Sequence, residues 1–266
     1  MRVLALIAAW NEERFIAGCL EHLFAHGVEA YLCDNDSTDG TVEIAERYLG
    51  RGLRGIERLP RDGTFRWRRI LERKAQLAAM LDADWYLHLD ADEVPLPPRS
   101  AGTLAAALAE VDAEGCNAVD FDEFTFVPTL ESPDHDHPNF RRTMRWYYPF
   151  APARPHRLIA WKRQPERVEL AASGGHVVAF PGRRIWPRRF GLRHYLFLSR
   201  EHAVRKYGSR RYDADEVRGG WHGWRSSLRA EAVRLPHEVE LRVADSDAEL
   251  DPSEPRIEHC ILWADP

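Results

Sequence analysis

Two aspartates, Asp90 and Asp92, stand two positions apart directly after the apolar run at 85–89. Carboxylates this close repel each other unless a divalent cation or a basic group lies between them. Hard oxygen ligands of this kind suit Mg²⁺ or Mn²⁺, and either ion can bridge the oxygens of a nucleoside diphosphate. The alternative is a turn in which the aspartates only cap the next segment. The spacing therefore predicts a metal site on Asp90 and Asp92, with the capped turn as the competing interpretation.

Two further polar clusters follow apolar runs in the first half of the chain. The run at 3–9 ends in Trp10-Asn11-Glu12-Glu13, and the run at 28–33 ends in Asp34-Asn35-Asp36-Ser37-Thr38-Asp39. Ligands of an open parallel sheet bind at the carboxyl ends of its strands. If these runs are parallel strands, all three clusters lie at one edge of the sheet.

The segments that position these clusters alternate between strand and helix patterns. Apolar runs predict strands, and apolar residues at helical spacing predict helices. Strands are predicted at 3–9, 28–33, 85–89 and 117–127. Helices are predicted from a cap at Asn11 to near Gly27, from capping residues 37–39 to about Gly50, at 66–82 and at 101–114. This order predicts an α/β fold with a mostly parallel, Rossmann-like sheet flanked by helices.

The predicted strand at 117–127 changes its apolar phase near the middle. Its apolar positions are odd-numbered up to Phe121 and even-numbered from Phe124. One extra residue at Asp122 and Glu123, a β-bulge, would explain the change, and bulges often redirect side chains beside active sites. The alternative is an edge strand with a solvated acidic face.

The rest of the chain is less regular. It is rich in Pro, Arg and aromatic residues, with short strands predicted at 157–162 and 176–180 and a helix near 200–208. One amphipathic helix and an acidic stretch are predicted in the tail. The predicted parts are a ligand-binding half at 1–127, a basic, aromatic-rich half at 128–212, and a C-terminal helix with an acidic tail at 213–266.

The net charge is small but unevenly distributed. The chain has 37 basic and 42 acidic side chains, a net charge of −5. Residues 1–136 carry 13 basic and 26 acidic side chains, 137–212 carry 18 and 3, and 213–266 carry 6 and 13. The net charges of these parts are therefore −13, +15 and −7. Either a polyanionic partner binds the +15 segment, or its arginines pair with the acidic flanks.

The composition excludes several classes of protein. Aromatic residues make up 11% of the chain and no long low-complexity tract is present, which excludes a disordered or fibrous protein. No apolar run approaches the roughly 20 residues of a transmembrane helix. The four cysteines are scattered without a CxxC pair, which favours reduced thiols in a cytoplasmic protein over disulfides or a zinc site.

The three polar clusters together resemble the family 2 glycosyltransferases of GT-A fold. The resemblance rests on Asn11-Glu12-Glu13, on the segment at 34–41 and on Asp90-Ala91-Asp92-Glu93, and it covers about the first 125 residues. It implies the GT-A form of the α/β fold with an irregular acceptor-side second half. It also implies inverting transfer of a sugar from a nucleotide-sugar, usually a UDP-sugar, with Mn²⁺ or Mg²⁺ as cofactor.

The resemblance assigns roles to individual residues. The nucleobase and ribose would be held by the ends of the first two strands: Trp10, Asn11, Glu12, Asp34 and Asn35. Asp90 and Asp92 would hold the sugar and the metal, and Lys74 would lie near the pyrophosphate. An ordinary solvated helix lysine is the alternative for Lys74.

A further metal ligand and the general base are expected farther along the chain. The segment at 191–195 resembles the C-terminal histidine segment of some family 2 enzymes, so His194 is predicted as a third ligand, against a core histidine bonded to backbone. His176 is a second candidate. For the base that deprotonates the acceptor hydroxyl, we predict Asp122 and Glu123.

The acceptor is expected at the basic segment. Its 18 cations interleave with aromatic residues, which suits phosphate contacts and base stacking. A nucleic acid, a lipid-linked diphosphate at a membrane surface and an anionic glycan are the alternatives, and the protein is expected to be cytoplasmic, free or peripheral to a membrane. The rival functions are a nucleotidyltransferase, whose Gly-rich phosphate loop is missing here, and a non-catalytic nucleic-acid-binding protein, which would leave the acidic clusters unused.

Overall fold

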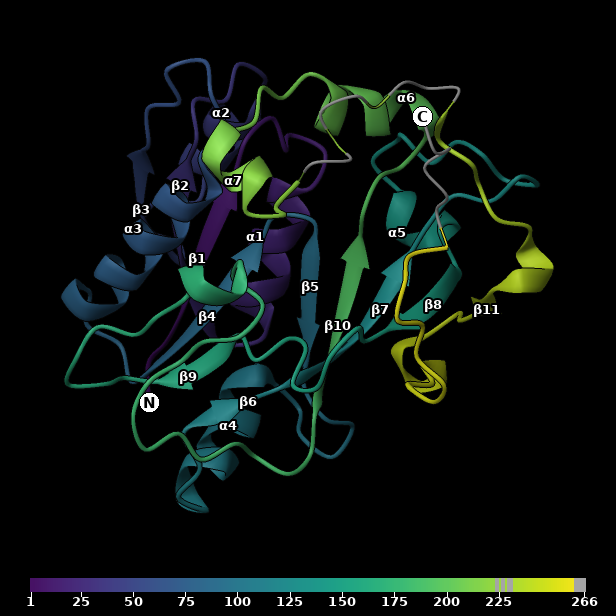
Figure 1. Cartoon of the computed structure of the whole chain (residues 1–266). Coiled ribbons are helices and arrows are strands. Elements are labelled where there is room, and N and C mark those ends of the chain that lie inside the picture. Colours follow the sequence, from purple (N-terminus) through teal and green to yellow (C-terminus); the bar gives the residue numbers. More distant parts are fainter. Residues whose placement is uncertain (223–224, 226–227, 229–231, 261–266) are drawn as a thin grey trace. The chain divides into compact units, whose positions relative to one another are not determined.

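The computed structural model describes residues 1–222, 225, 228 and 232–260, which form two compact units (Figure 1). Each unit draws on separate stretches of the chain. Unit 1 consists of Met1–Arg61, Trp67–Phe121 and Pro155–Leu192, and unit 2 consists of Asp62–Arg66, Asp122–Arg154 and Arg193–Pro266.

Unit 1 is built on a six-stranded sheet with the order β3-β2-β1-β4-β9-β6. Its strands are β1 (Val3–Ala9), β2 (Val28–Asp34), β3 (Leu53–Arg58), β4 (Trp85–Asp90), β6 (Ala118–Val119) and β9 (Ala160–Lys162). The first four strands are parallel, and β9 runs antiparallel to both β4 and β6. Every residue of β1 is buried, as expected for a central strand covered on both faces.

Four helices connect the strands of unit 1. They are α1 (Ile16–Ala25), α2 (Thr41–Glu46), α3 (Trp67–Met80) and α4 (Leu104–Ala113). The chain moves from β1 through α1 to β2 in one direction, and returns through α3 to β4 on the other side of β1. Since such crossovers are right-handed, α1 and α3 cover opposite faces of the sheet. The direction reverses between β1 and β4, and ligands of open α/β sheets bind at the carboxyl ends of the strands beside such a reversal.

Unit 2 contains a smaller sheet and its own core. Its strands follow the order β11-β8-β7-β10, with bounds β7 (Phe121–Phe126), β8 (Trp146–Phe150), β10 (Phe190–Tyr195) and β11 (Arg242–Val243). The short helices are α5 (Phe140–Thr143), α6 (Arg200–Ala203), the π-turn η2 (Val204–Gly208) and α7 (Ala214–Arg218). Aromatic and aliphatic side chains from β8, from η2 and from the segment around Phe197 pack together as the core of this unit.

The structure confirms the α/β fold and the main elements expected in the first half. The strands expected at 3–9, 28–33 and 85–89 are β1, β2 and β4, and the helices expected at 66–82 and 101–114 are α3 and α4. The cap residue of α2 is Gly40, which has no capping side chain, but the Thr41 backbone N–H at the start of the helix donates to Asp39 Oδ1 over 3.0 Å. These elements have long apolar runs or strong helical spacing.

The predicted helix cap at Asn11 is wrong. Asn11 has a left-handed backbone (φ 57°), and the residue that precedes α1 is Phe15. The Asn11 side chain instead accepts a hydrogen bond from the Thr38 backbone N–H at 2.7 Å. It therefore ties the first polar cluster to the second.

The bulge predicted at Asp122 and Glu123 stays a prediction. From Glu123 to Phe126, β7 pairs with β8 without a shift of register, but this pairing does not include Asp122. The strand is interrupted at Asp120, with β6 before it and β7 after it. The alternative, a solvated edge strand, is excluded because β7 lies between β8 and β10 and Glu123 is only 3% exposed. Since β7 is buried on both faces, its apolar residues need not keep one phase.

Several elements of the structure are not evident in the sequence pattern. β3 lacks an apolar run, β8 contains Pro149, and β10 alternates poorly. The strand predicted at 176–180 forms only isolated bridges at Val177 and Ala179. In the predicted tail, α7 is described, whereas 223–224, 226–227, 229–231 and 261–266 lie outside the described residues.

Candidate active site

The turn after β4 carries three acidic side chains in unit 1. Asp90 ends β4, and Asp92 and Glu93 follow it, with Glu93 opening β5 (Glu93–Leu96). The Asp90 side chain is 42% exposed, whereas Asp92 and Glu93 are 5% and 3% exposed. Asp90 Oδ1 is buried and accepts no hydrogen bond from the described part of the chain. Glu93 Oε2 accepts the Asp90 backbone N–H at 3.0 Å, so the third carboxylate holds the turn in shape.

Lys74 of α3 lies under this turn and is fully buried. Its ammonium donates to the Leu89 carbonyl at 2.7 Å and to His88 Nδ1 at 2.9 Å, and it lies 3.8 Å from Asp90 Oδ1. Burial lowers the pKa of Lys74 to about 8, against the opposing attraction of Asp90. A solvated helix lysine is therefore excluded.

Arg157 is a second buried cation at the turn, and the sequence analysis did not single it out. Its guanidinium forms an ion pair with Glu93, and its side chain is 9% exposed. Burial lowers the pKa of Arg157 to about 10, opposed by the charges of Asp90 and Asp92. The Arg157 backbone N–H donates to Asp120 Oδ1 at 2.9 Å. The only sequence hint is an arginine inside the apolar stretch at 156–161, which is a weak one.

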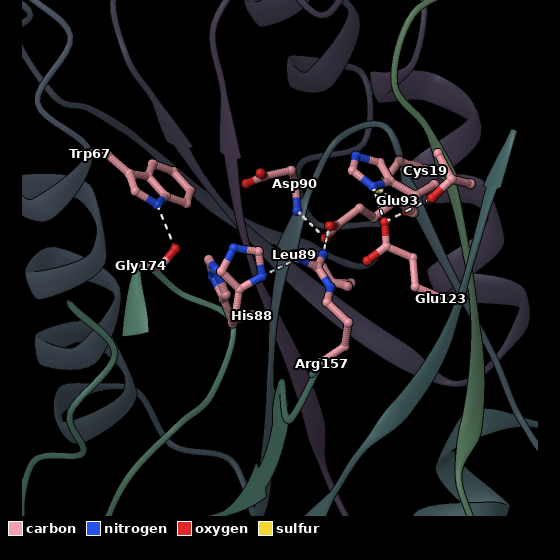
Figure 2. A network of polar contacts seen from close by, with 12 residues as sticks. Cys19, Trp67, His88, Leu89, Asp90, Glu93, Glu123, Arg157 and Gly174 are labelled. Carbon is pink, nitrogen blue, oxygen red and sulfur yellow. Dashed lines mark hydrogen bonds and ion pairs between the residues drawn. The ribbon is translucent and has the colours of Figure 1, made fainter. Parts of the chain in front are cut away.

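A glycine turn closes the site on the side of His88 (Figure 2). The Trp67 indole N–H donates to the Gly174 carbonyl at 2.8 Å. At Gly175, which has φ +91°, an added Cβ would lie 2.7 Å from His88 Nε2. The pKa of His88 is well below its usual value, first because of burial and then because of the charge on Lys74. His88 is therefore neutral, and only glycine fits beside it.

His176, the second metal candidate, directly follows that glycine turn. Its side chain is exposed, and its Nδ1 lies 3.2 Å from Arg157 Nη1. Its ring stacks on His156 with 5.4 Å between centroids. Because an arginine only donates, His176 Nδ1 is the acceptor of this bond and faces the arginine rather than a metal.

The clusters after β1 and β2 are brought together as predicted. Ala9 pairs with Asp34, the Asn11 backbone N–H donates to Ser37 Oγ at 2.9 Å, and the Glu12 N–H donates to the Thr41 hydroxyl at 2.8 Å. These bonds join the two strand ends into one surface at the carboxyl edge of the sheet.

The second cluster contains two buried polar side chains. Asp34 is 3% exposed, and burial raises its pKa despite hydrogen bonds from Ser37. The Asn35 amide donates to the Leu59 carbonyl at 2.8 Å, whereas its buried Oδ1 has no partner among the described residues. An acceptor of this kind suits the N–H edge of a nucleobase.

Arg61 adds a contact that the sequence did not indicate. Its guanidinium stacks over the Trp10 ring at 3.6 Å from the centroid. The Arg61 backbone N–H donates to Asp36 Oδ2 at 2.6 Å, and this bond, with Arg58, lowers the pKa of Asp36. Asp36 thus fixes the segment that covers one face of Trp10.

In unit 2, two predicted residues with different roles are hydrogen-bonded to each other. His194 Nδ1 lies 2.6 Å from Glu123 Oε1, and the Thr125 hydroxyl donates to the same oxygen at 3.2 Å. The carboxylate fixes the ring so that Nε2 is the nitrogen that can bind a metal or accept a proton. Asp122, the other candidate base, is more exposed than Glu123.

The acidic turn has the side chains that a divalent cation bound together with its substrate would need. Among residues 1–222, 225, 228 and 232–260, no three His, Cys, Asp or Glu side chains are arranged to hold a metal ion. Mg²⁺ and similar ions, however, are commonly bound through one or two carboxylates, with water and substrate phosphates completing the shell. Asp90 and Asp92 meet this requirement, since both offer hard carboxylate oxygens and Asp90 Oδ1 accepts no hydrogen bond from any residue that the structure describes.

Cys19 and Cys33 are buried, Cys116 and Cys260 are partly buried, and none of the four forms a disulfide in the part of the chain that the structure describes. In the part of the chain that the structure describes, no helix is both long and apolar enough to cross a membrane.

Comparison with solved structures finds similar chains at low identity. S. aureus TarS 1–349 in complex with UDP is 12% identical, with 74% of this chain and 61% of that one covered and a TM-score of 0.42. The mannosyltransferase PcManGT from Pyrobaculum calidifontis, with GDP-Man and Mn²⁺, is 18% identical, with 78% and 61% covered and a TM-score of 0.47. Glucosyl-3-phosphoglycerate synthase from Mycobacterium tuberculosis, with Mn²⁺, UDP and glucosyl-3-phosphoglycerate, is 21% identical, with 47% and 44% covered and a TM-score of 0.32. The chain thus spans less than two thirds of the length of each.

Two further comparisons concern curated proteins and protein families. No curated protein matches the chain. The family model described as glycosyl transferase family 2 matches residues 5–167, which include most of β1, all of β2 to β4, the acidic turn, Lys74 and Arg157. Because this match covers more than half of the 266 residues, the chain belongs to glycosyl transferase family 2.

Proposed function

We propose that the chain is a metal-dependent glycosyltransferase that moves a sugar from a nucleoside diphosphate sugar, a UDP-sugar, to an acceptor hydroxyl with inversion. One observation carries the proposal. Asp90 and Asp92 stand at the carboxyl end of β4, beside the reversal of strand order, with an Asp90 oxygen that has no hydrogen-bond donor among the described residues. This is where an open α/β sheet binds its ligand.

The donor would bind along the joined ends of β1, β2 and β4. Trp10, Asn11, Glu12, Asp34 and Asn35 would take the nucleobase and ribose. A metal on Asp90 and Asp92 would neutralise the charge that develops on the leaving diphosphate. The protein's own contribution is to hold these carboxylates in place: Glu93 bonds the backbone of Asp90, and Arg157 bonds Glu93.

The general base is proposed to be Asp122. Glu123 already accepts hydrogen bonds from His194 and Thr125, and a carboxylate so occupied is a poorer proton acceptor. We assign Glu123 the role of orienting His194, which keeps His194 as the proposed third metal ligand. Inversion follows from direct attack by the deprotonated acceptor hydroxyl.

The acceptor is proposed to be a hydroxyl on an anionic molecule. Seven cations of the segment 137–212 form ion pairs with carboxylates of the acidic flanks: Arg145, Arg157, Lys162, Arg163, Arg189, Arg193 and Arg205. At least seven of the 18 cations are thus paired within the protein, so a polyanionic acceptor stays compatible with the segment but is no longer required by its charge. A cytoplasmic location is proposed from the sequence alone, because the four cysteines are scattered without a CxxC pair.

The decisive test is nucleotide release from a panel of UDP-sugars and GDP-sugars, each with Mn²⁺, with Mg²⁺ and with EDTA. We expect metal-dependent release from a UDP-sugar, and a loss of at least a hundredfold in Asp92→Asn. Asp215→Asn is the matched control, because this carboxylate is exposed on α7. If no donor is turned over, or if EDTA leaves the rate unchanged, the proposal fails.

A further inference from the structure

Lys74 has its N–H groups directed into the protein. An ammonium has three donors. Two of them bond the Leu89 carbonyl and His88 Nδ1, at 2.7 and 2.9 Å, and the remaining polar neighbour is Asp90 Oδ1 at 3.8 Å. Lys74 is 0% exposed, so a bound diphosphate would have to displace one of these partners to reach it.

The partner of Lys74 is held as firmly as Lys74 itself. His88 accepts from the ammonium through Nδ1, so Nε2 is the ring nitrogen that carries the proton. Nε2 is the atom that an added Cβ at Gly175 would approach to 2.7 Å, so the glycine turn closes the other side of the ring. The Lys74 and His88 side chains and this glycine turn therefore pack together at β4.

Asp90 is the member of the acidic turn that depends on these side chains. Its side chain is 42% exposed, and its buried Oδ1 lies 3.8 Å from the Lys74 ammonium and accepts no hydrogen bond from the described residues. A fixed positive charge on one side of a half-exposed carboxylate selects one orientation of it, since other orientations lose the attraction. The second oxygen is then presented away from the cation.

From this geometry we infer that Lys74 is a positioning residue, which with His88 orients the Asp90 carboxylate for the metal, and that it makes no contact with the donor diphosphate. The inference rests on the proposed function and differs from the role that the family resemblance gave to Lys74. It separates two tasks: orientation of the metal ligand by Lys74, and recognition of the diphosphate by other groups.

The two roles predict different binding data for Lys74→Met, which removes the charge and keeps an unbranched chain. If Lys74 only positions Asp90, the affinity for UDP in EDTA stays within about twofold of wild type, while Mn²⁺ alone binds at least fivefold more weakly. If Lys74 bonds the diphosphate, UDP affinity in EDTA falls about tenfold or more, as for loss of a charged hydrogen bond. If Lys74 is only a nearby repelling charge, Mn²⁺ binds more tightly.

The experiment measures Mn²⁺ binding by electron paramagnetic resonance and UDP binding in EDTA by calorimetry, with GDP in place of UDP if the donor panel selects it. Arg73→Met is the matched control, because Arg73 is the preceding residue of α3 but pairs with Glu57. His88→Leu is the second variant, which removes the partner and leaves the ammonium. It should weaken Mn²⁺ binding as Lys74→Met does, and Lys74→Met/His88→Leu should be no worse than either alone.

Weaker UDP binding in EDTA, or Mn²⁺ binding that is unchanged or tighter in Lys74→Met, overturns the inference. Additive losses in Lys74→Met/His88→Leu also overturn it, because the two residues then act separately. If the wild-type chain binds neither Mn²⁺ nor nucleotide, the proposed function itself fails and the positioning role falls with it. If wild type binds both, only the inference is at stake.

Discussion

Removal of the Arg157 guanidinium should destabilise the protein more than loss of any exposed ion pair. Arg157 and Glu93 have side chains that are 9% and 3% exposed, so both charges have left water. In Arg157→Met, the Glu93 carboxylate keeps one hydrogen-bond donor among the described residues, the Asp90 backbone N–H at 3.0 Å. Breaking one side of a buried ion pair costs about 3–5 kcal/mol, because the remaining charge is buried without compensation. We expect a loss in this range.

The assay is urea unfolding followed by circular dichroism, with the free energy of unfolding taken by linear extrapolation. The matched control is Arg163→Met, since Arg163 pairs with Asp82 at 2.9 Å but the two side chains are 47% and 72% exposed. Its loss should be no more than about 1 kcal/mol. Glu93→Leu/Arg157→Met, which removes both charges, should recover part of the loss of Arg157→Met. Equal losses in Arg157→Met and Arg163→Met would refute the argument from burial.

Three further substitutions test separate parts of the structure. Gly175→Ala should lower the free energy of unfolding by about 1–3 kcal/mol, because φ at this residue is +91° and the new Cβ would lie 2.7 Å from a buried imidazole nitrogen. Gly182→Ala is the control: φ is +70° there and the space around it is open, so the loss in the same urea assay should be smaller. Burial, then Arg225 and Arg210, lower the pKa of His222 to about 3, so the unfolded chain binds the extra proton first and stability falls as pH drops from about 6.5 toward 3. His222→Gln should lack this part of the pH dependence, at most about 1.4 kcal/mol per pH unit, and identical profiles would contradict it. Glu123→Gln should weaken Mn²⁺ binding 10- to 100-fold if the histidine it orients is a ligand, and unchanged affinity by paramagnetic resonance would remove that histidine from the site.

The parts of the fold that sequence predicts well are those whose environment is uniform along the element. β1 is buried at all seven positions and reads as one apolar run, and α3 shows one apolar face over 14 residues. The alternation of apolar residues in β7 is less informative, because this strand is buried on both faces. It therefore does not indicate whether a bulge is present. The helix cap predicted at Asn11 is wrong for another reason. The Asn11 side chain has a long-range partner, Thr38, and this contact competes with local capping.

In the candidate site, too, residues with local partners are easier to predict than residues with partners far away in the sequence. Asp90 and Asp92 could be found because their chemistry depends on near neighbours in sequence. Arg157 could not, because its partner Glu93 is distant in the chain, and only the pairing of β9 with β4 brings the two together. Arg61 over Trp10 is a similar case, since an ordinary arginine after a strand gives no sign of its stacking. Contacts between residues far apart in the sequence have no regular spacing from which they could be predicted.

The position of the basic side chains limits where an anionic acceptor can bind in unit 1. The loop with Arg184 and Arg188 is fixed to β6, since the Asn117 N–H donates to the Arg184 carbonyl at 2.9 Å. Ala118, the first residue of β6, and Tyr86, the second residue of β4, pair with the same residue of β9. Ala118 is therefore level with Tyr86, which lies four residues before Asp90.

At about 3.3 Å per residue, this loop is therefore about 13 Å along the strand direction from the acidic turn, toward the amino end of β4. Its arginines raise the charge of the segment at a distance from the turn where the sugar would leave. The cations beside the acidic turn are Lys74 and Arg157, and both are buried and bonded within the protein. The +15 segment thus includes charge that stabilises the fold, and a search for acceptors by net charge alone would be misdirected.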